Sequence, residues 1–92
     1  MIISAEVDCL IYDAQSLKNK RAVLKRIKTR LHNEFNIAVS ELEFQNLWQR
    51  TRLGLVTIAS DKTIAEQTMQ QALTFIDSFP EIERTETQIE WL

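Results

Sequence analysis

Apolar and polar residues follow a regular order in six successive segments of the chain. Four of these segments show the two-residue alternation or the short apolar runs of β-strands: residues 2–12, 37–44, 52–60 and 82–91. The run over residues 52–60 is apolar enough to lie in the centre of a sheet. Residues 82–91 alternate, with Thr85, Thr87, Ile89 and Trp91 on one face and Arg84, Glu86, Gln88 and Glu90 on the other, which predicts an edge strand.

The segment after the first strand repeats its apolar positions at helical spacing. One stripe of that helix contains Leu17, Val23, Leu24, Ile27, Leu31 and Phe35. We expect the helix to run from about Leu17 to Phe35. Ser16 is a good N-cap, because its hydroxyl can accept a hydrogen bond from a free amide of the first turn. Asn36 is expected to end the helix, because asparagine tolerates the left-handed conformation.

A second helix follows the third strand. Ser60 or Asp61 caps its start, and a broad apolar stripe extends to about Phe79 before Pro80 stops it. Residues 45–51, between the second and third strands, are expected to form a hairpin connection that is longer than a minimal turn.

The order of the elements is therefore strand, helix, strand, strand, helix, strand. Two right-handed βαβ crossovers that flank a hairpin form the ferredoxin-like arrangement. We predict an α+β fold, with a ferredoxin-like βαββαβ chain, a four-stranded antiparallel sheet and two helices on one face. A chain of 92 residues is long enough for one such domain, over residues 1–92.

The composition is ordinary for a soluble globular protein, with 45% hydrophobic and 26% charged residues. No apolar run approaches the roughly 20 residues that cross a bilayer. The N-terminal segment lacks the basic start of a signal peptide. Cys9 is the single cysteine and has no partner for an internal disulfide, which fits a reducing compartment. We expect a cytoplasmic protein.

Several kinds of site chemistry are disfavoured. Gly54 is the only glycine, so glycine-rich phosphate loops are absent, and one His with one Cys does not supply the usual zinc ligands. Cys9 lies on the apolar side of the first strand and is interpreted as a small buried side chain. Acids near the open sheet face are interpreted as solvating charge rather than catalytic pairs. These acids are Glu6, Asp8, Glu41, Glu43, Glu86 and Glu90. We expect no enzyme activity, cofactor, metal or small-molecule substrate.

The charges are unevenly distributed along the chain. Residues 17–33 hold seven of the 11 Lys and Arg residues and none of the 13 Asp and Glu residues. The outward side of this helix carries Lys18, Arg21, Lys25, Arg26 and His32. Two interpretations are open: a solvated helix face, or a surface for an anionic partner, most often nucleic-acid phosphate. The absence of mixed signs suggests the second, since pairs of opposite charge stabilise a solvated helix.

Further residues are candidates for the same surface. Lys20 falls inside the apolar stripe, where it either extends past the end of the sheet or joins Lys18 and Arg21 at the anion-favouring helix N-terminus. Trp48, which Arg50 follows closely, either stacks on a base or a partner, or folds back to cover the core.

The open sheet face is a second candidate surface. Its acids, with Tyr12 as the only expected aromatic residue, argue against the base stacking used by RNA-recognition motifs. Leu10 and Tyr12 among these acids are compatible with a dimer surface instead.

The stretches YDAQSLKNKRAVLKRIKTRL, FNIAVSE and LWQR, with the LG that follows, resemble the YlxP-like family of small bacterial proteins of unknown function. The resemblance covers nearly the whole chain. It implies a ferredoxin-like fold and a chromosomal neighbourhood near the genes for initiation factor two and ribosome-binding factor A. It supplies no catalytic residues. The family pattern falls on Ser16, Leu17, Lys18, Lys20, Arg21 and Trp48.

Together these observations predict a non-enzymatic accessory factor linked to ribosome maturation or translation. Its expected partner is RNA or a ribosomal subunit, and not a membrane. The candidate RNA-binding residues are Lys18, Lys20, Arg21, Lys25, Arg26, Trp48 and Arg50. The alternative is a homodimeric protein-interaction or regulatory module that uses the open sheet face.

Overall fold

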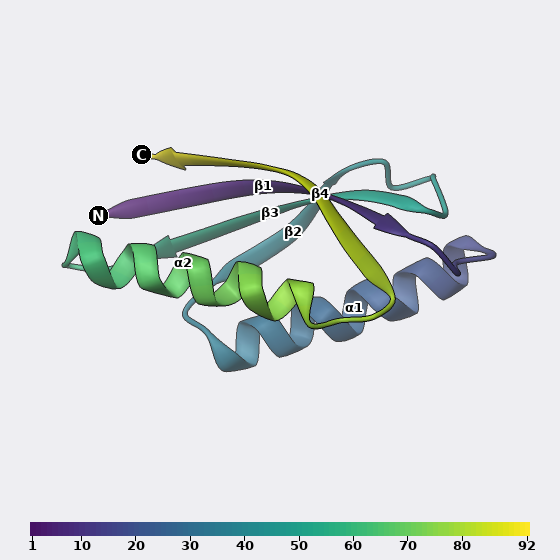
Figure 1. The fold of residues 1–92 in the computed structure, drawn as a ribbon, viewed down its shortest axis with the longest axis horizontal. Helices are drawn as coiled ribbons and strands as arrows, with labels where there is room; N and C mark the ends of the chain where they lie inside the picture. The colour runs from purple at the N-terminus through teal and green to yellow at the C-terminus, as the bar shows by residue number, and fades with distance from the viewer.

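The computed structural model describes residues 1–92, arranged as a layer of strands and a layer of helices. The six elements are β1 (Ile2–Ile11), α1 (Leu17–Glu34), β2 (Ala38–Glu43), β3 (Arg50–Ile58), α2 (Lys62–Asp77) and β4 (Ile82–Trp91). The strands form one antiparallel sheet in the order β2-β3-β1-β4. Both helices lie on the same face of this sheet (Figure 1). The predicted βαββαβ fold is confirmed, with β3 inside the sheet and β4 at an edge.

The hydrophobic core lies between the sheet and the helices. Alternate side chains of β1 are buried on this side, namely Ile3, Ala5, Val7, Cys9 and Ile11. α1 packs mainly against β2, whereas α2 packs against β1, β3 and β4. Burial of Cys9 raises the pKa of its thiol to about 12. The interpretation of Cys9 as a small buried side chain is confirmed.

α1 begins as predicted but ends differently. The Ser16 hydroxyl accepts a hydrogen bond from the Asn19 amide at 3.0 Å. The helix ends because Phe35 adopts an extended backbone, with φ of −131°. The prediction of a left-handed Asn36 is wrong, since Phe44 is the one non-glycine residue with positive φ.

An irregularity in β4 changes which of its residues face the helices. Its pairing with β1 shifts register between Val7 and Cys9, so Arg84 and Thr87 share the helix-side face. The Arg84 guanidinium donates to the Thr87 hydroxyl at 3.0 Å and lies 2.8 Å from the Asp77 carboxylate of α2. A strict two-residue alternation would place Arg84 on the face opposite to Thr87. This prediction is wrong, because β4 contains one residue more than β1 between the paired positions, and Arg84 therefore moves to the helix side.

The two chain ends lie side by side. The Leu92 amide donates to the Ile2 carbonyl oxygen at 2.9 Å. Figure 1 shows both termini at one end of the molecule, whereas the β2–β3 connection and the start of α1 lie at the other end. The molecule extends 42 Å along this axis.

A buried ion pair fixes the chain where β2 ends. The Lys20 side chain is 1% exposed, and its ammonium lies 2.9 Å from a carboxylate oxygen of Glu41 and donates to the Phe44 carbonyl oxygen at 2.5 Å. The Glu41 carboxylate also accepts a hydrogen bond from the Thr51 hydroxyl at 2.6 Å. Phe44 has φ of 65°, a conformation that bulky residues rarely adopt. Lys20 therefore stabilises a strained turn. Its predicted contact with an anionic partner is wrong, because its ammonium is inaccessible.

The Phe44 ring is held from the open side of the sheet. The guanidinium groups of Arg50 and Arg52 lie 4.0 and 5.3 Å from its centroid, within the range of cation–π attraction. Arg52 also donates to both carboxylate oxygens of Asp8, at 2.7 and 3.4 Å. The hydrogen bond from Arg52 lowers the pKa of Asp8 below its usual range. Three cationic side chains thus converge on the residue that begins the β2–β3 loop.

The buried ion pair yields a stability prediction. We expect Lys20→Met to lower the free energy of unfolding by about 3 kcal/mol, because it leaves the Glu41 carboxylate without its counter-charge. The double variant Lys20→Met/Glu41→Leu should recover most of this loss, since both charges are then removed. Urea unfolding measures both effects. The exposed control Lys25→Met should change stability by less than about 0.5 kcal/mol; equal losses in Lys20→Met and Lys25→Met would contradict the role of the pair.

The Asp8–Arg52 pair yields a pH prediction. Above about pH 4, the usual Asp pKa, the carboxylate is charged in the native and unfolded states and the pair stabilises the fold in full. As the pH falls through the lowered native pKa, Asp8 takes up a proton and this contribution is lost. Urea midpoints should therefore fall less steeply with acidification in Asp8→Asn than in the parent chain. The matched change at exposed Asp13, which makes no ion pair, should leave the acid slope intact.

Candidate nucleic-acid interface

The buried stripe of α1 separates two charged flanks. This stripe consists of Lys20, Leu24, Ile27 and Leu31. On one side, four cations follow each other at intervals of three or four residues and therefore form a continuous row. We call this row the basic flank; it consists of Lys18, Arg21, Lys25 and Lys28. None of its members makes an ion pair or a side-chain hydrogen bond within the protein.

The other flank of α1 is occupied by contacts near α2. Arg26 forms an ion pair with Glu81, and the Arg30 guanidinium lies 5.1 and 5.2 Å from the ring centroids of Phe75 and Phe79. Because these partners lie toward α2, the basic flank points away from α2 and past the β2 edge of the sheet. The structure thus separates Arg26 from Lys18, Arg21 and Lys25, although sequence reasoning placed the four on one surface.

Lys28 is a member of the basic flank that the predicted set left out. It follows Lys25 by three residues and Arg21 by seven, which is the spacing of neighbours on one helix side. That spacing was visible in the sequence and identifies the residue. α1 contains no acid before Glu34, so no carboxylate of the helix balances the flank.

The β2–β3 loop, residues 44–49, lies at the same end of the molecule as the start of α1 (Figure 1). Gln49 ties it to the β1–α1 connection, because its side chain donates to the carbonyl oxygens of Tyr12 and Ala14, both at 3.2 Å. The Lys20 hydrogen bond to Phe44 joins the loop to α1 itself. The structure therefore brings the loop and the N-terminal part of the basic flank to one end of the fold.

Trp48 stands out from this loop with 51% of its surface exposed. The interpretation that Trp48 folds back over the core is wrong, since the loop holds it at the surface. Arg50 lines one surface depression with Trp48, but its guanidinium is engaged within the fold, because it stacks on Phe44 and lies 3.9 Å from Asp8. The predicted residues that make no ion pair and no side-chain hydrogen bond in the fold are Lys18, Arg21, Lys25 and Trp48.

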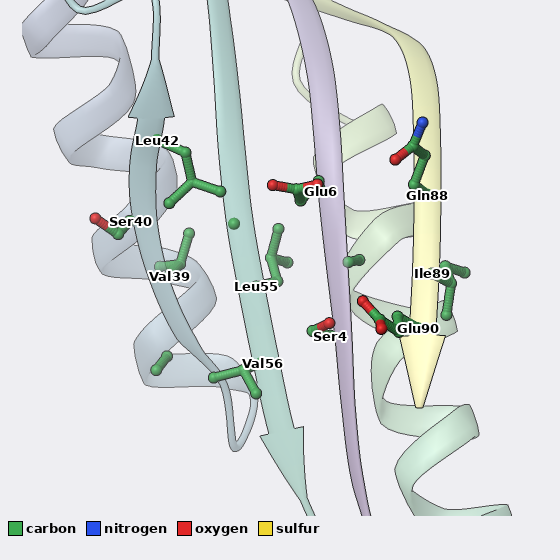
Figure 2. Close-up of a pocket in the computed structure, with 13 residues that line it drawn as sticks. Ser4, Glu6, Val39, Ser40, Leu42, Leu55, Val56, Gln88, Ile89 and Glu90 are labelled. Carbon is green, nitrogen blue, oxygen red and sulfur yellow. The ribbon is translucent and has the colours of Figure 1, made fainter. Parts of the chain in front are cut away.

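The open sheet face has a different character. Figure 2 shows Leu42 of β2 reaching toward β3, with Glu6 of β1 and Glu90 of β4 on the opposite side of a shallow concavity of about 690 Å³. Glu41, an expected open-face acid, lies instead on the helix side with Lys20. Tyr12 is exposed, and its hydroxyl donates to Glu83. No aromatic side chain lines the concavity, so it does not resemble a base-stacking platform.

Two further findings concern site chemistry and membranes. No group of three or more His, Cys, Asp or Glu side chains is arranged to hold a metal ion. Neither helix combines the length and the apolar character that crossing a bilayer requires.

Solved structures similar to this chain share its fold at low sequence identity. The de novo designed protein Foldit4 matches with a TM-score of 0.61 and 15% identity, over 100% of this chain and 99% of that one. The designed protein LFR1 1, described as having a ferredoxin fold, matches with a TM-score of 0.59 and 12% identity, over 100% and 87%. A C-terminal segment of the alpha subunit of aIF2 from Pyrococcus abyssi matches with a TM-score of 0.54 and 18% identity, over 94% and 51%.

Sequence comparison gives a closer relationship. The chain is 56% identical over 91 residues to the uncharacterized protein YlxP of Bacillus subtilis (strain 168), and the match covers 99% of each chain. A family model described as "Protein of unknown function (DUF503)" matches residues 2–89. The expected resemblance to the YlxP-like family is confirmed, and the chain belongs to the DUF503 family.

Proposed function

We propose that this protein is a non-enzymatic accessory factor linked to ribosome maturation or translation, which binds RNA through the basic flank of α1. The observation that carries the proposal is the row of four cations, Lys18, Arg21, Lys25 and Lys28, that have no ionic partner in the fold. The chain has a formal net charge of −2, so this row is a local feature and not a consequence of a basic composition.

An extended polyanion suits such a row better than a single anion does. Like charges at helical spacing repel one another, and successive phosphates along a nucleic-acid strand relieve this repulsion at several positions at once. Contacts of this kind position a partner without reading its sequence. Trp48 would add a second contact, because its exposed indole offers a surface for base stacking on the loop at the same end of the fold as the start of α1.

The link to the ribosome rests on the resemblance to the YlxP-like family. The gene neighbourhood that this resemblance implies, near initiation factor two and ribosome-binding factor A, supports structured ribosomal RNA as the physiological ligand. The open face supports RNA binding less well, because its free carboxylates repel phosphates.

The basic flank is tested by removing its charge. We expect Lys18→Gln/Arg21→Gln/Lys25→Gln to weaken binding to a labelled single-stranded oligouridine and to bacterial ribosomal subunits by about tenfold or more, because three phosphate contacts are lost. The slope of log affinity against log salt should become shallower by about 3. Fluorescence anisotropy and co-sedimentation over a salt series measure these changes.

A matched control places the same charge change on the other helix. Gln67→Glu/Gln70→Glu/Gln71→Glu on exposed positions of α2 lowers the net charge by the same three units. If binding weakens equally in both triple variants, overall charge and not the basic flank governs it. If neither changes binding, the site is wrongly assigned.

Trp48 gives a second, independent prediction. In a Trp91→Phe background Trp48 is the only tryptophan, and its fluorescence should be quenched when oligouridine binds. Trp48→Ala should weaken binding by about 1 kcal/mol or more through loss of stacking, with little change in the salt slope. A Trp91→Ala control should bind normally. Unchanged Trp48 fluorescence at saturating RNA would exclude the loop from the interface.

A further inference from the structure

The pairing registers define how side chains are ordered on the open face. Ser4 of β1 lies opposite Val56 of β3, which lies opposite Ala38 of β2. One row further along, Glu6 lies opposite Gly54. Because partners across an antiparallel pair share a face, these rows run across the whole sheet from β4 to β2.

Between Ala38 and Leu42 of β2 and between Gly54 and Ile58 of β3, the open face is uncovered and apolar except for Ser40. Leu42 is 41% exposed and Ile58 is 59% exposed, with Val56 and Ala38 between them. Gly54 shapes the floor: a Cβ atom there would lie 2.7 Å from Leu42 Cδ1, so the leucine side chain lies directly over the glycine backbone. The result is a shallow apolar groove along β3.

The β1–β4 half carries carboxylates. Glu6, Glu86 and Glu90 form no ion pair, whereas Asp8 at the end of the row is neutralised by Arg52. Gln88 lies between the acids on β4. Beyond the Asp8–Arg52 pair, the face therefore divides lengthwise into a mainly apolar half and an acidic half that meet between β3 and β1.

A second copy of this chain does not match that division. A two-fold axis parallel to the strands would lay the apolar half of one copy on the acidic half of the other. An axis in the plane of the face and perpendicular to the strands would pair the two apolar halves, but it would also place the two acidic halves against each other, which like charges oppose. RNA is also unsuitable, since the face presents carboxylates to its phosphates.

We infer that the open face binds an amphipathic helix of a protein partner, with an apolar stripe over β2–β3 and Lys or Arg side chains over Glu6 and Glu90. A helix is roughly 10 Å wide and two strands span about the same width, so one helix lying along the β3–β1 boundary touches both halves. Charge complementarity sets its orientation, and the groove beside Leu42 receives its apolar side chains.

This surface lies on the side of the sheet away from α1 (Figure 1), so it is separate from the basic flank. The domain would then join a protein to an RNA, with one ligand on each side of the fold. The inference does not depend on RNA binding, because its site shares no residue with the basic flank.

The test uses a synthetic helical peptide with a leucine stripe and a lysine flank. We expect saturable binding by fluorescence anisotropy, with amide shifts confined to the open-face residues of the sheet in NMR spectra. A peptide with glutamate in place of lysine, and a scrambled peptide of the same composition, should each bind at least about tenfold more weakly. Equal affinity for the scrambled peptide would overturn the inference.

Paired variants locate the site. Leu42→Ser and Glu6→Lys should each weaken peptide binding by about tenfold. The matched controls, Leu47→Ser in the loop and Glu66→Lys on α2, should leave peptide affinity unchanged. Circular dichroism and a cooperative urea transition show whether Leu42→Ser folds, independently of RNA binding. The inference would be overturned if the control variants weakened peptide binding equally. It would also be overturned if the parent chain sedimented as a dimer and the Leu42→Ser variant sedimented as a monomer, because a second copy would then occupy the open face.

Discussion

Only one face of the four-stranded sheet is covered, because both helices pack against that face and leave the other face in contact with water. Burial of the helix-facing side chains of β1 and β3 requires this arrangement. It also leaves two surfaces free for partners: the side of α1 that turns away from α2, and the bare face of the sheet. The proposed RNA site and the proposed peptide site are these two surfaces.

Hydrophobic periodicity was sufficient to predict the order of the elements and the positions of β3 and β4, because each depends on which side of a short segment is buried. The Ser16 cap was predictable from its hydroxyl, which accepts an amide hydrogen bond of the first turn. It could not predict the partners of polar residues. Lys20 lies 21 residues before Glu41, and Arg26 lies 55 residues before Glu81, so helical spacing alone gives no sign of either pair. The predicted orientation of Arg84 was wrong for a related reason, since one register shift exchanges the two faces of a strand for all residues beyond it.

The turn at Phe44 links stability to the candidate site. A left-handed phenylalanine is unfavourable by about 1 kcal/mol or more on its own, and contacts with Lys20, Arg50 and Arg52 offset this strain. Residues that look like ligands in the sequence therefore support the loop that presents Trp48. The basic flank, by contrast, makes no ionic contact that stabilises the fold. Its charges can be changed with little effect on folding.

The adjacent chain ends have a practical consequence. Ile2 and Leu92 are joined by a hydrogen bond at one end of a molecule 42 Å long, and the β2–β3 loop, which carries Trp48, lies at the other end. A fused domain or a surface tether attached at either terminus extends away from the tryptophan. An immobilised chain therefore presents its loop outward in a uniform orientation, and a bulky amino-terminal or carboxy-terminal tag leaves the loop accessible.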